Sequence, residues 1–197
     1  YRVVVVDDGS KDGTAQQALS FPVTVLRHAV NLGQGAALQT GIRYALQQGS
    51  EFIVTFDADG QHNQADIEKL LAACRDGKCA VALGTRFAQG GEAKAITFRK
   101  RLLLRVAIWL TRWMTGLKVT DTHNGLRVFS RRAAAKIEIR QNGMAHASEI
   151  LNQIASKQLS FVEVPVTIVY TPYSLKKGQS LWNGINILWE LLSGKLK

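Results

Sequence analysis

The sequence contains little cysteine and little proline, and it has no long apolar run. Its two cysteines, Cys74 and Cys79, are too few for a disulfide scaffold, and their spacing matches no common zinc motif. Three prolines and 17 glycines exclude a linker-like or fibrous chain. No apolar run reaches the roughly 18 residues of a membrane span, and the first residues are typical of a strand rather than of a signal peptide. We therefore expect an ordinary globular domain with reduced cysteines.

Acidic residues are scarce in the second half of the chain. The whole sequence has 25 Lys and Arg against 15 Asp and Glu. Residues 1–98 contain 9 basic and 10 acidic side chains, whereas residues 99–197 contain 16 and 5. This asymmetry favours a phosphate-bearing partner such as anionic lipid, a phosphorylated substrate or nucleic acid. A solvated basic surface is the structural alternative.

The first half alternates short β-branched runs with helical patterns. The predicted strands are Val3–Val6, Val23–Arg27, Phe52–Phe56 and Ala80–Gly84, and the predicted helices are Ala15–Leu19, Ala36–Gln48 and Gln64–Cys74. Strands separated by helices indicate a parallel α/β sheet. The unbroken run Val3–Val6 predicts a strand buried on both faces.

The second half is less regular. Helices are predicted over Phe98–Met114, near Arg132–Ile137, over Ser148–Ser156 and over Leu181–Leu192, and a strand over Phe161–Tyr170. No linker or repeat divides the chain. We expect one domain covering residues 1–197.

Carboxylates follow two of the predicted strands. Asp57 and Asp59 come directly after Phe52–Phe56, and residues i and i+2 of an extended chain point the same way. Ligands of parallel α/β sheets bind beyond the carboxyl ends of the strands. Magnesium and manganese prefer oxygen ligands and are often bound by one or two carboxylates plus substrate phosphates. The pattern predicts a Mg²⁺ or Mn²⁺ site, to which Gln61 and His62 could add a ligand.

Asp7 and Asp8 end the first predicted strand beside a glycine turn. One of the two could accept hydrogen bonds from a base or a ribose, while Ser10 or Asp12 could cap the next helix. Gly33-Gln34-Gly35 resembles part of a dinucleotide fingerprint, but Leu38 stands where that motif needs Gly or Ala. A nicotinamide cofactor is therefore not expected.

Five short motifs occur in order along nearly the whole chain. They are Asp7-Asp8-Gly9-Ser10, Asn31-x-Gly33-x-Gly35, Asp57-Ala58-Asp59-Gly60-Gln61-His62, Gly84-Thr85-Arg86 and Asp121-x-x-Asn124-Gly125-Leu126-Arg127. Together they resemble glycosyltransferase family 2, especially its dolichyl/polyprenyl-phosphate sugar synthase-like branch. The resemblance implies an α/β GT-A (Rossmann-like) fold, with a mostly parallel central sheet flanked by helices. It also implies an inverting enzyme that is usually metal dependent.

The resemblance implies roles for individual residues. Asp8, with Asp7 beside it, would contact the base or ribose of a nucleotide-sugar donor, and Gly35 belongs to the donor-binding motif. Asp57, Asp59 and Gln61 would hold the metal against the diphosphate. Arg86 would lie near the donor phosphates or the acceptor, and Arg127 would meet an anionic group. A donor-covering loop would contain Tyr173, Lys177, Gly178 and Ser180, although Gln179 stands where the family often has Lys.

One element of the family pattern has no counterpart in residues 1–197. The family usually begins with a strand before its Asp-Asp-Gly-Ser strand, whereas Tyr1 lies immediately before Val3. We expect a GT-A sheet without the first family strand.

The expected reaction moves a sugar from a GDP- or UDP-linked donor to a polyprenyl phosphate or a saccharide. A phosphate acceptor is already ionised near neutral pH. A hydroxyl acceptor needs a general base, for which Asp121 is the first candidate and Glu149 a poorer one. Asp121 could equally cap a turn.

The basic helix Phe98–Met114 carries Arg and Lys beside Trp and Leu. This pattern suits a helix lying at an anionic membrane surface, and the expected location is cytoplasmic, at the inner face of the membrane. An amphipathic helix packed on the core has the same periodicity.

Three other classes of protein share part of these features. A signalling receiver domain also has acids after its first and third strands, but Asp59 and the basic second half oppose it. A sugar nucleotidyltransferase also binds metal and nucleotide, but its glycine-rich signature is missing. Nucleic-acid binding is not expected, since no zinc module, basic zipper or aromatic RNA motif accompanies the charge.

Overall fold

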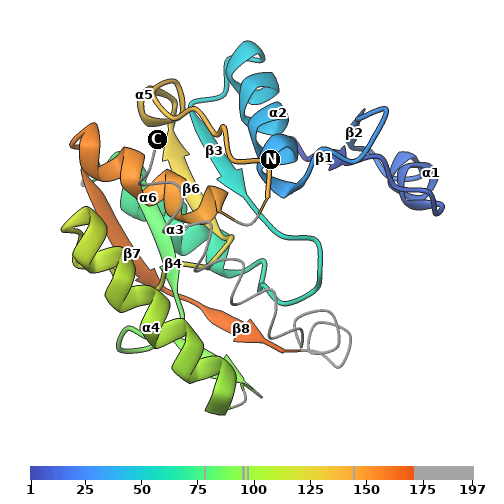
Figure 1. Cartoon of the computed structure of the whole chain (residues 1–197). Coiled ribbons are helices and arrows are strands. Elements are labelled where there is room, and N and C mark those ends of the chain that lie inside the picture. The colour runs from blue at the N-terminus through green and yellow to red at the C-terminus, as the bar shows by residue number, and fades with distance from the viewer. Residues whose placement is uncertain (78, 95, 97, 144, 171–197) are drawn as a thin grey trace.

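The computed structural model (Figure 1) describes residues 1–170 except 78, 95, 97 and 144. The predicted helix Leu181–Leu192 and the predicted loop with Tyr173, Lys177, Gly178 and Ser180 lie outside these residues. In chain order the strands are β1 (Val4–Asp7), β2 (Thr24–Arg27), β3 (Phe52–Thr55), β4 (Val81–Thr85), β5 (Glu92–Lys94), β6 (Arg127–Ser130), β7 (Phe161–Pro165) and β8 (Thr167–Val169). The helices are α1 (Thr14–Leu19), α2 (Gln34–Gln47), α3 (Asp66–Arg75), α4 (Phe98–Thr115), α5 (Arg131–Ala134) and α6 (His146–Ser156).

The main sheet has the order β3-β6-β4-β7. β6 is antiparallel to both β3 and β4, and β7 is parallel to β4, so β3, β4 and β7 all run in the same direction. β1 and β2 form a separate parallel pair, and β5 and β8 form another. The predicted parallel arrangement is therefore correct for β3, β4 and β7, with the reversed strand β6 between β3 and β4, whereas β1 lies in a separate parallel pair with β2.

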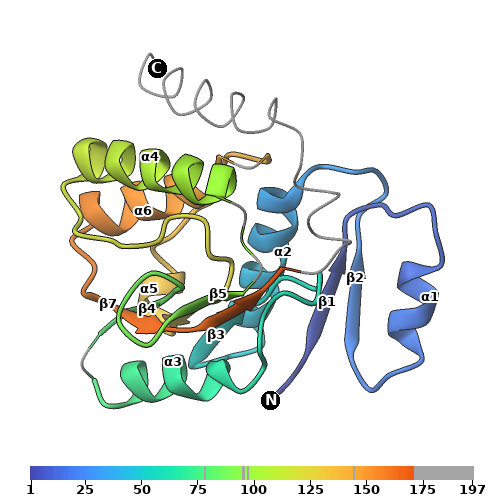
Figure 2. The same ribbon diagram turned by 90° about the horizontal axis from the view of Figure 1, so that it is seen from below.

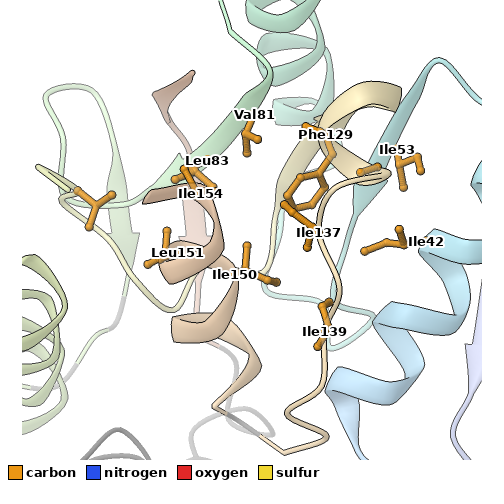
Figure 3. Close-up of a cluster of buried hydrophobic side chains, with 13 residues drawn as sticks. Ile42, Ile53, Val81, Leu83, Phe129, Ile137, Ile139, Ile150, Leu151 and Ile154 are labelled. Atoms are coloured by element: carbon orange, nitrogen blue, oxygen red, sulfur yellow. The ribbon is translucent and has the colours of Figure 1, made fainter. Parts of the chain in front are cut away.

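Helices cover both faces of the main sheet. In Figure 2, α4 and α6 lie on one side of the strands and α3 on the other. Alternating side chains of β4 and β6 enter two separate apolar cores, since successive strand residues point to opposite faces. Val81 and Phe129 belong to the core under α2, α5 and α6, whereas Ala82 and Val128 belong to the core under α3. Figure 3 shows the first of these cores.

Two predictions about the chain between Ala80 and Tyr170 are corrected. The predicted single strand Phe161–Tyr170 is divided into β7 and β8, which belong to different sheets. The two strands are separated at Val166, and directly after this break Asp66 Oδ2 accepts a hydrogen bond from the backbone N–H of Thr167. β5, which pairs with β8, was not predicted, since three residues carry too little pattern to indicate a strand.

Candidate donor-binding site

One cavity of about 1750 Å³ lies beyond the carboxyl ends of β1 and β3 and extends between these strands. Asp8, Asp57, Asp59, Arg86 and Arg127 all line it, although they are far apart in the sequence. The structure therefore gathers most of the predicted site residues at one place.

Asp57 is the central carboxylate of the cavity. Its Oδ1 accepts a hydrogen bond from Gln34 Nε2 at 2.9 Å, and its Oδ2 lies 3.4 Å from His62 Nε2. Burial alone would raise the pKa of Asp57, but His62 and the charge of Arg127 hold it below the usual value. Asp57 is thus ionised at neutral pH.

Gly125 allows this position of Asp57. A Cβ atom on Gly125 would lie 2.0 Å from Asp57 Oδ2, far inside van der Waals contact. Thr55, at the end of β3, donates its hydroxyl to the carbonyl oxygen of Gly125 at 2.7 Å. Gly125, in the 121–127 motif, therefore leaves the space that the Asp57 carboxylate occupies.

Asp59 is oriented by Gln61, for which the resemblance implies a role as a metal ligand. The backbone N–H of Gln61 donates to Asp59 Oδ1 at 3.1 Å, and Gln61 Nε2 donates to Asp59 Oδ2 at 2.8 Å. The amide oxygen of Gln61 is then directed away from the carboxylate. Within the described ranges, no three His, Cys, Asp or Glu side chains are grouped so as to hold a metal ion by themselves. Asp57, Asp59 and Gln61 all line the cavity, and their carboxylate and amide oxygens are of the ligand type that Mg²⁺ and Mn²⁺ bind together with phosphate oxygens.

Asp8 fixes the loop between β2 and α2. Its Oδ1 accepts from the backbone N–H of Leu32 at 2.9 Å and lies 2.7 Å from His28 Nδ1, and its Oδ2 accepts from the N–H of Gly33 at 2.7 Å. These donors lower its pKa although burial opposes them. A carboxylate offers about four acceptor positions. One position on Oδ2 therefore remains for a hydroxyl or N–H of a ligand.

Asp7 and Gly35 have structural contacts instead. Asp7 Oδ1 accepts from the N–H of Ser10 at 3.0 Å, and Asp7 Oδ2 lies 3.2 Å from Arg27 Nε. A Cβ on Gly35 would lie 1.9 Å from the carbonyl oxygen of Gln141. Neither residue lines the cavity. Their assignment to donor binding stays a prediction, and the described contacts give both a role in shaping the loops around the site.

Arg86 and Asp121 form a buried ion pair. Arg86 Nε and Nη2 donate to the two oxygens of Asp121 at 2.6 and 3.2 Å, and Nη1 donates to Tyr170 Oη at 2.5 Å. The Asp121 side chain is 0% exposed. Burial alone would lower the pKa of Arg86, but the charge of Asp121 keeps it raised. Asp121 therefore positions Arg86, and this geometry disfavours its predicted role as a general base.

Glu149, the poorer candidate base, lies elsewhere. Its carboxylate accepts from the backbone N–H groups of Arg140 and Gln141 at 2.9–3.1 Å, and it does not line the cavity. It holds the loop before α6.

Three basic side chains, Arg127, His146 and His123, also line the cavity. Burial lowers the pKa of Arg127, of His146 and of His123, the last to about 4. For Arg127, the negative charges of Asp57 and Asp121 oppose this lowering of the pKa. Among the described residues, His123 Nε2 finds no hydrogen-bond partner. Sequence reasoning did not identify His28, His123, His146 or Tyr170, because a lone histidine or tyrosine carries no spacing signal.

The sequence matches a family model and several relatives. Residues 1–138 match the model of glycosyl transferase family 2. The chain is 38% identical, over 98% of its length and 81% of the relative's, to an uncharacterised protein of Methanocaldococcus jannaschii. It is 30% identical to a UDP-N-acetylglucosamine–dolichyl-phosphate N-acetylglucosaminyltransferase of Methanococcus voltae, over 98% of this chain and 85% of the relative. A polyprenol monophosphomannose synthase of Mycolicibacterium smegmatis is 31% identical to this chain, over 94% of this chain and 71% of the synthase.

The fold also matches solved structures. A glucosyl-3-phosphoglycerate synthase from Mycobacterium tuberculosis, in complex with Mn²⁺, UDP and phosphoglyceric acid, superposes with a TM-score of 0.66 at 16% identity, over 98% of this chain and 66% of that one. The match with a mycobacterial protein has a TM-score of 0.68 and covers 59% of that chain. The predicted GT-A fold is confirmed by these neighbours together with the family match. The family match does not support the two alternative classes, a signalling receiver domain and a sugar nucleotidyltransferase. The chain belongs to glycosyltransferase family 2, in the branch that resembles the dolichyl- and polyprenyl-phosphate sugar synthases.

Proposed function

We propose that the protein transfers a sugar, with inversion, from a nucleotide-diphosphate donor to a polyprenyl phosphate, with Mg²⁺ or Mn²⁺ as cofactor. The observation that carries this proposal is the convergence of Asp8, Asp57, Asp59, Arg86 and Arg127 on one cavity. The names of the relatives support a lipid-phosphate acceptor, and the Mn²⁺ and UDP of the fold neighbour support a metal and a nucleotide.

The proposed metal ligands are Asp57, Asp59 and Gln61. The ion, when bound, supplies positive charge that stabilises the leaving diphosphate. Gln34 and His62 hold the Asp57 carboxylate in place. Gln61 holds Asp59 in the same way. Such prior orientation reduces the reorganisation that transfer requires.

The proposed donor contact on the nucleoside side is Asp8. Three donors from His28 and the loop already fix its carboxylate, and Oδ2 keeps one acceptor position free toward the cavity. We assign that position to a ribose hydroxyl or base N–H. Lys177 and Ser180, which the resemblance places in a donor-covering loop, remain proposed donor contacts outside the described residues.

The environment of Asp121 favours a phosphate acceptor over a hydroxyl acceptor. A hydroxyl must lose its proton during attack, and the first candidate base is buried in its pair with Arg86. A phosphate monoester is already mostly ionised at pH 7, because its second pKa is about 6. Arg86 keeps N–H donors beyond those used by Asp121 and Tyr170, and Arg127 adds positive charge nearby. The positive charges of Arg86 and Arg127 support an anionic acceptor.

We further propose that α4 attaches the protein to an anionic membrane, where a polyprenyl phosphate would be found. Leu104, Ala107 and Ile108 of α4 are buried against the domain. The other face exposes Leu102, Val106, Trp109 and Trp113, with the exposed Arg101 and Arg105 beside them. The buried face fits packing on the core, and the exposed face supports the proposed membrane contact. Among the described helices, none is sufficiently long and apolar to span a bilayer.

A two-step experiment tests the donor and acceptor. Thermal unfolding is measured with GDP, UDP, CDP and TDP, each with and without Mn²⁺, for the native chain and for Asp59→Asn. We expect one diphosphate to raise the melting temperature of the native chain only with metal, and Asp59→Asn to lose this response. The matching nucleotide sugar is then offered with a polyprenyl phosphate or with a free oligosaccharide. Transfer to the oligosaccharide alone would contradict the lipid-phosphate proposal.

A further inference from the structure

Asp8 and His28 lie side by side at the carboxyl ends of the parallel strands β1 and β2. Asp7 is the register partner of Arg27, and the backbone N–H of His28 donates to the carbonyl oxygen of Asp7 at 2.9 Å. The two side chains meet directly after the strands, with His28 Nδ1 2.7 Å from Asp8 Oδ1. Only 17% of the Asp8 side chain and 12% of the His28 side chain are exposed. Asp8 therefore has little freedom to change its partners.

His28 is a fixed hydrogen-bond donor to Asp8, and Thr40 of α2 holds its ring. An ionised carboxylate only accepts hydrogen bonds, so His28 Nδ1 carries a proton and donates it to Asp8. On the other side of the ring, His28 Nε2 lies 2.9 Å from Thr40 Oγ1. The Thr40 hydroxyl can donate to this nitrogen when the ring is neutral and accept from it when the ring is protonated. In both states Nδ1 remains a donor to Asp8.

The Asp8 carboxylate has one acceptor position left, on Oδ2. Each carboxylate oxygen offers about two positions. Oδ1 uses both, since it accepts from His28 Nδ1 and from the backbone N–H of Leu32 at 2.9 Å. Among the described residues, Oδ2 accepts only from the N–H of Gly33, at 2.7 Å. Because Asp8 lines the cavity, a ligand there can give this carboxylate one hydrogen bond, but not two side by side.

Nucleobases differ in the donors that they present to such a carboxylate. Guanine presents a ring N–H next to an amino group, and this pair fits the two oxygens of an unoccupied carboxylate. With Oδ1 already occupied, one of the two guanine donors would stay without a partner, which is unfavourable in an enclosed site. Cytosine presents an amino group beside an unprotonated ring nitrogen, whose lone pair would face the negative charge. Uracil and thymine present a single ring N–H between two carbonyl groups, and this pattern matches one free acceptor position.

The loop beside Asp8 also offers a donor for the carbonyl groups of such a base. Asn31 directly precedes Leu32 and Gly33, whose N–H groups donate to Asp8, and it lines the same cavity. The side chain of Asn31 is exposed, and its amide group can donate to a carbonyl oxygen. A ring N–H flanked by carbonyl oxygens thus finds both an acceptor and a neighbouring donor here.

We propose that His28 makes the site selective for a sugar donor whose base is a pyrimidine dione, uracil or thymine, because it occupies Oδ1 of Asp8. This inference rests on the proposed function, since it requires Asp8 to contact the nucleoside. The ring N–H of the base donates to the free position on Oδ2. His28 is thus a positioning residue that acts through Asp8, and Thr40 keeps its ring in place.

Isothermal titration of nucleoside diphosphates in the presence of Mn²⁺ tests the choice of base. UDP or TDP should bind at least about tenfold more tightly than GDP and CDP. The preferred nucleotide methylated at N3, which lacks the ring N–H, should bind at least about tenfold more weakly than its parent. Tightest binding of GDP or CDP, or equal binding of the parent and its N3-methyl form, would overturn the inference and leave the proposed transfer reaction standing. Binding of none of these diphosphates would overturn both.

Variants at position 28 test the role of His28 itself. His28→Ala frees a position on Oδ1, so the ratio of the GDP dissociation constant to that of the preferred nucleotide should fall at least about fivefold. A general loss of folded protein weakens both nucleotides alike and leaves this ratio unchanged. His28→Asn is the matched control, because its side-chain amide can donate from nearly the place of Nδ1 and should keep the ratio within about twofold of the native value. An unchanged ratio in His28→Ala, or an equal fall in His28→Asn, would overturn the role assigned to His28.

Discussion

At the scale of single residues, the site depends on how closely Asp57 approaches Gly125. The Asp57 carboxylate can take its position because Gly125, 68 positions away in the chain, has no side chain to obstruct that carboxylate. The sequence motif marks both residues but does not show that they touch. Their contact arises because β3 and β6 are paired.

Gly125→Ala should weaken metal-dependent nucleotide binding by at least about tenfold, or ~1.4 kcal/mol. The new Cβ would overlap Asp57 Oδ2 and force the carboxylate away from its position. Isothermal titration of the responsive diphosphate with Mn²⁺ measures the effect. Gly13→Ala is the matched control, because a Cβ at Gly13 meets nothing within 4 Å. Equal binding by both variants would show that the position of Asp57 is unimportant.

His123 should make the fold sensitive to mild acid. Burial lowers its pKa from 6.5 to about 4, so the unfolded chain takes up the proton first as the pH falls. Stability is then complete above pH 6.5 and decreases below it, by about 2 kcal/mol between pH 7 and 5. Urea unfolding across this range should show a smaller loss for His123→Gln, with His146 contributing in the same direction. An identical pH dependence in both proteins would refute this account.

At the scale of elements, α4 has two apolar faces, and only tertiary structure shows which is covered. The sequence predicted the helix almost to its ends, because 18 residues carry a clear period. By contrast, the three-residue strands β5 and β8 are too short to show a period of hydrophobic residues. The break between β7 and β8 within residues 161–170 was therefore not predicted. Periodicity indicates that a face is apolar, but not whether another element packs on it.

The double variant Trp109→Ser/Trp113→Ser should reduce retention on anionic vesicles about tenfold or more. Both side chains are about two-thirds exposed, at 65% and 67%, and indole rings favour the interfacial region. Vesicle flotation in moderate salt measures retention. Phe21→Ser is the control, since Phe21 is similarly exposed but lies outside α4. If the control loses as much binding as the double variant, the assignment of α4 fails.

At the scale of the whole molecule, β6 is the element that joins the two apolar cores. Phe129 is fully buried in one core and its neighbour Val128 in the other. Phe129 also lies between β3 and β4, opposite Ile53 and Val81 (Figure 3). The reversed strand β6 therefore lies between β3, which is followed by Asp57 and Asp59, and β4, which is followed by Arg86.

Phe129→Ala should lower the free energy of unfolding by about 3–5 kcal/mol, because it removes a large buried ring and leaves a cavity. Urea denaturation at pH 7 gives this value. Phe21→Ala, at a side chain that is 61% exposed, should cost far less. Similar losses in the two variants would mean that β6 is not the centre of the core.

The sequence by itself determined the α/β class, the long helices and the placement of acids at strand ends, because periodicity and turn chemistry are local properties. It also indicated the family, since five motifs in order are more specific than any one of them. Only the tertiary structure decided that Asp121 is bound to Arg86, that Gly125 leaves room for Asp57 and that His123 and His146 line the same cavity. It also showed that the run Val3–Val6, predicted to be buried on both faces, is only partly buried. Such facts depend on which distant segments the fold brings into contact, and residue spacing carries no record of those contacts.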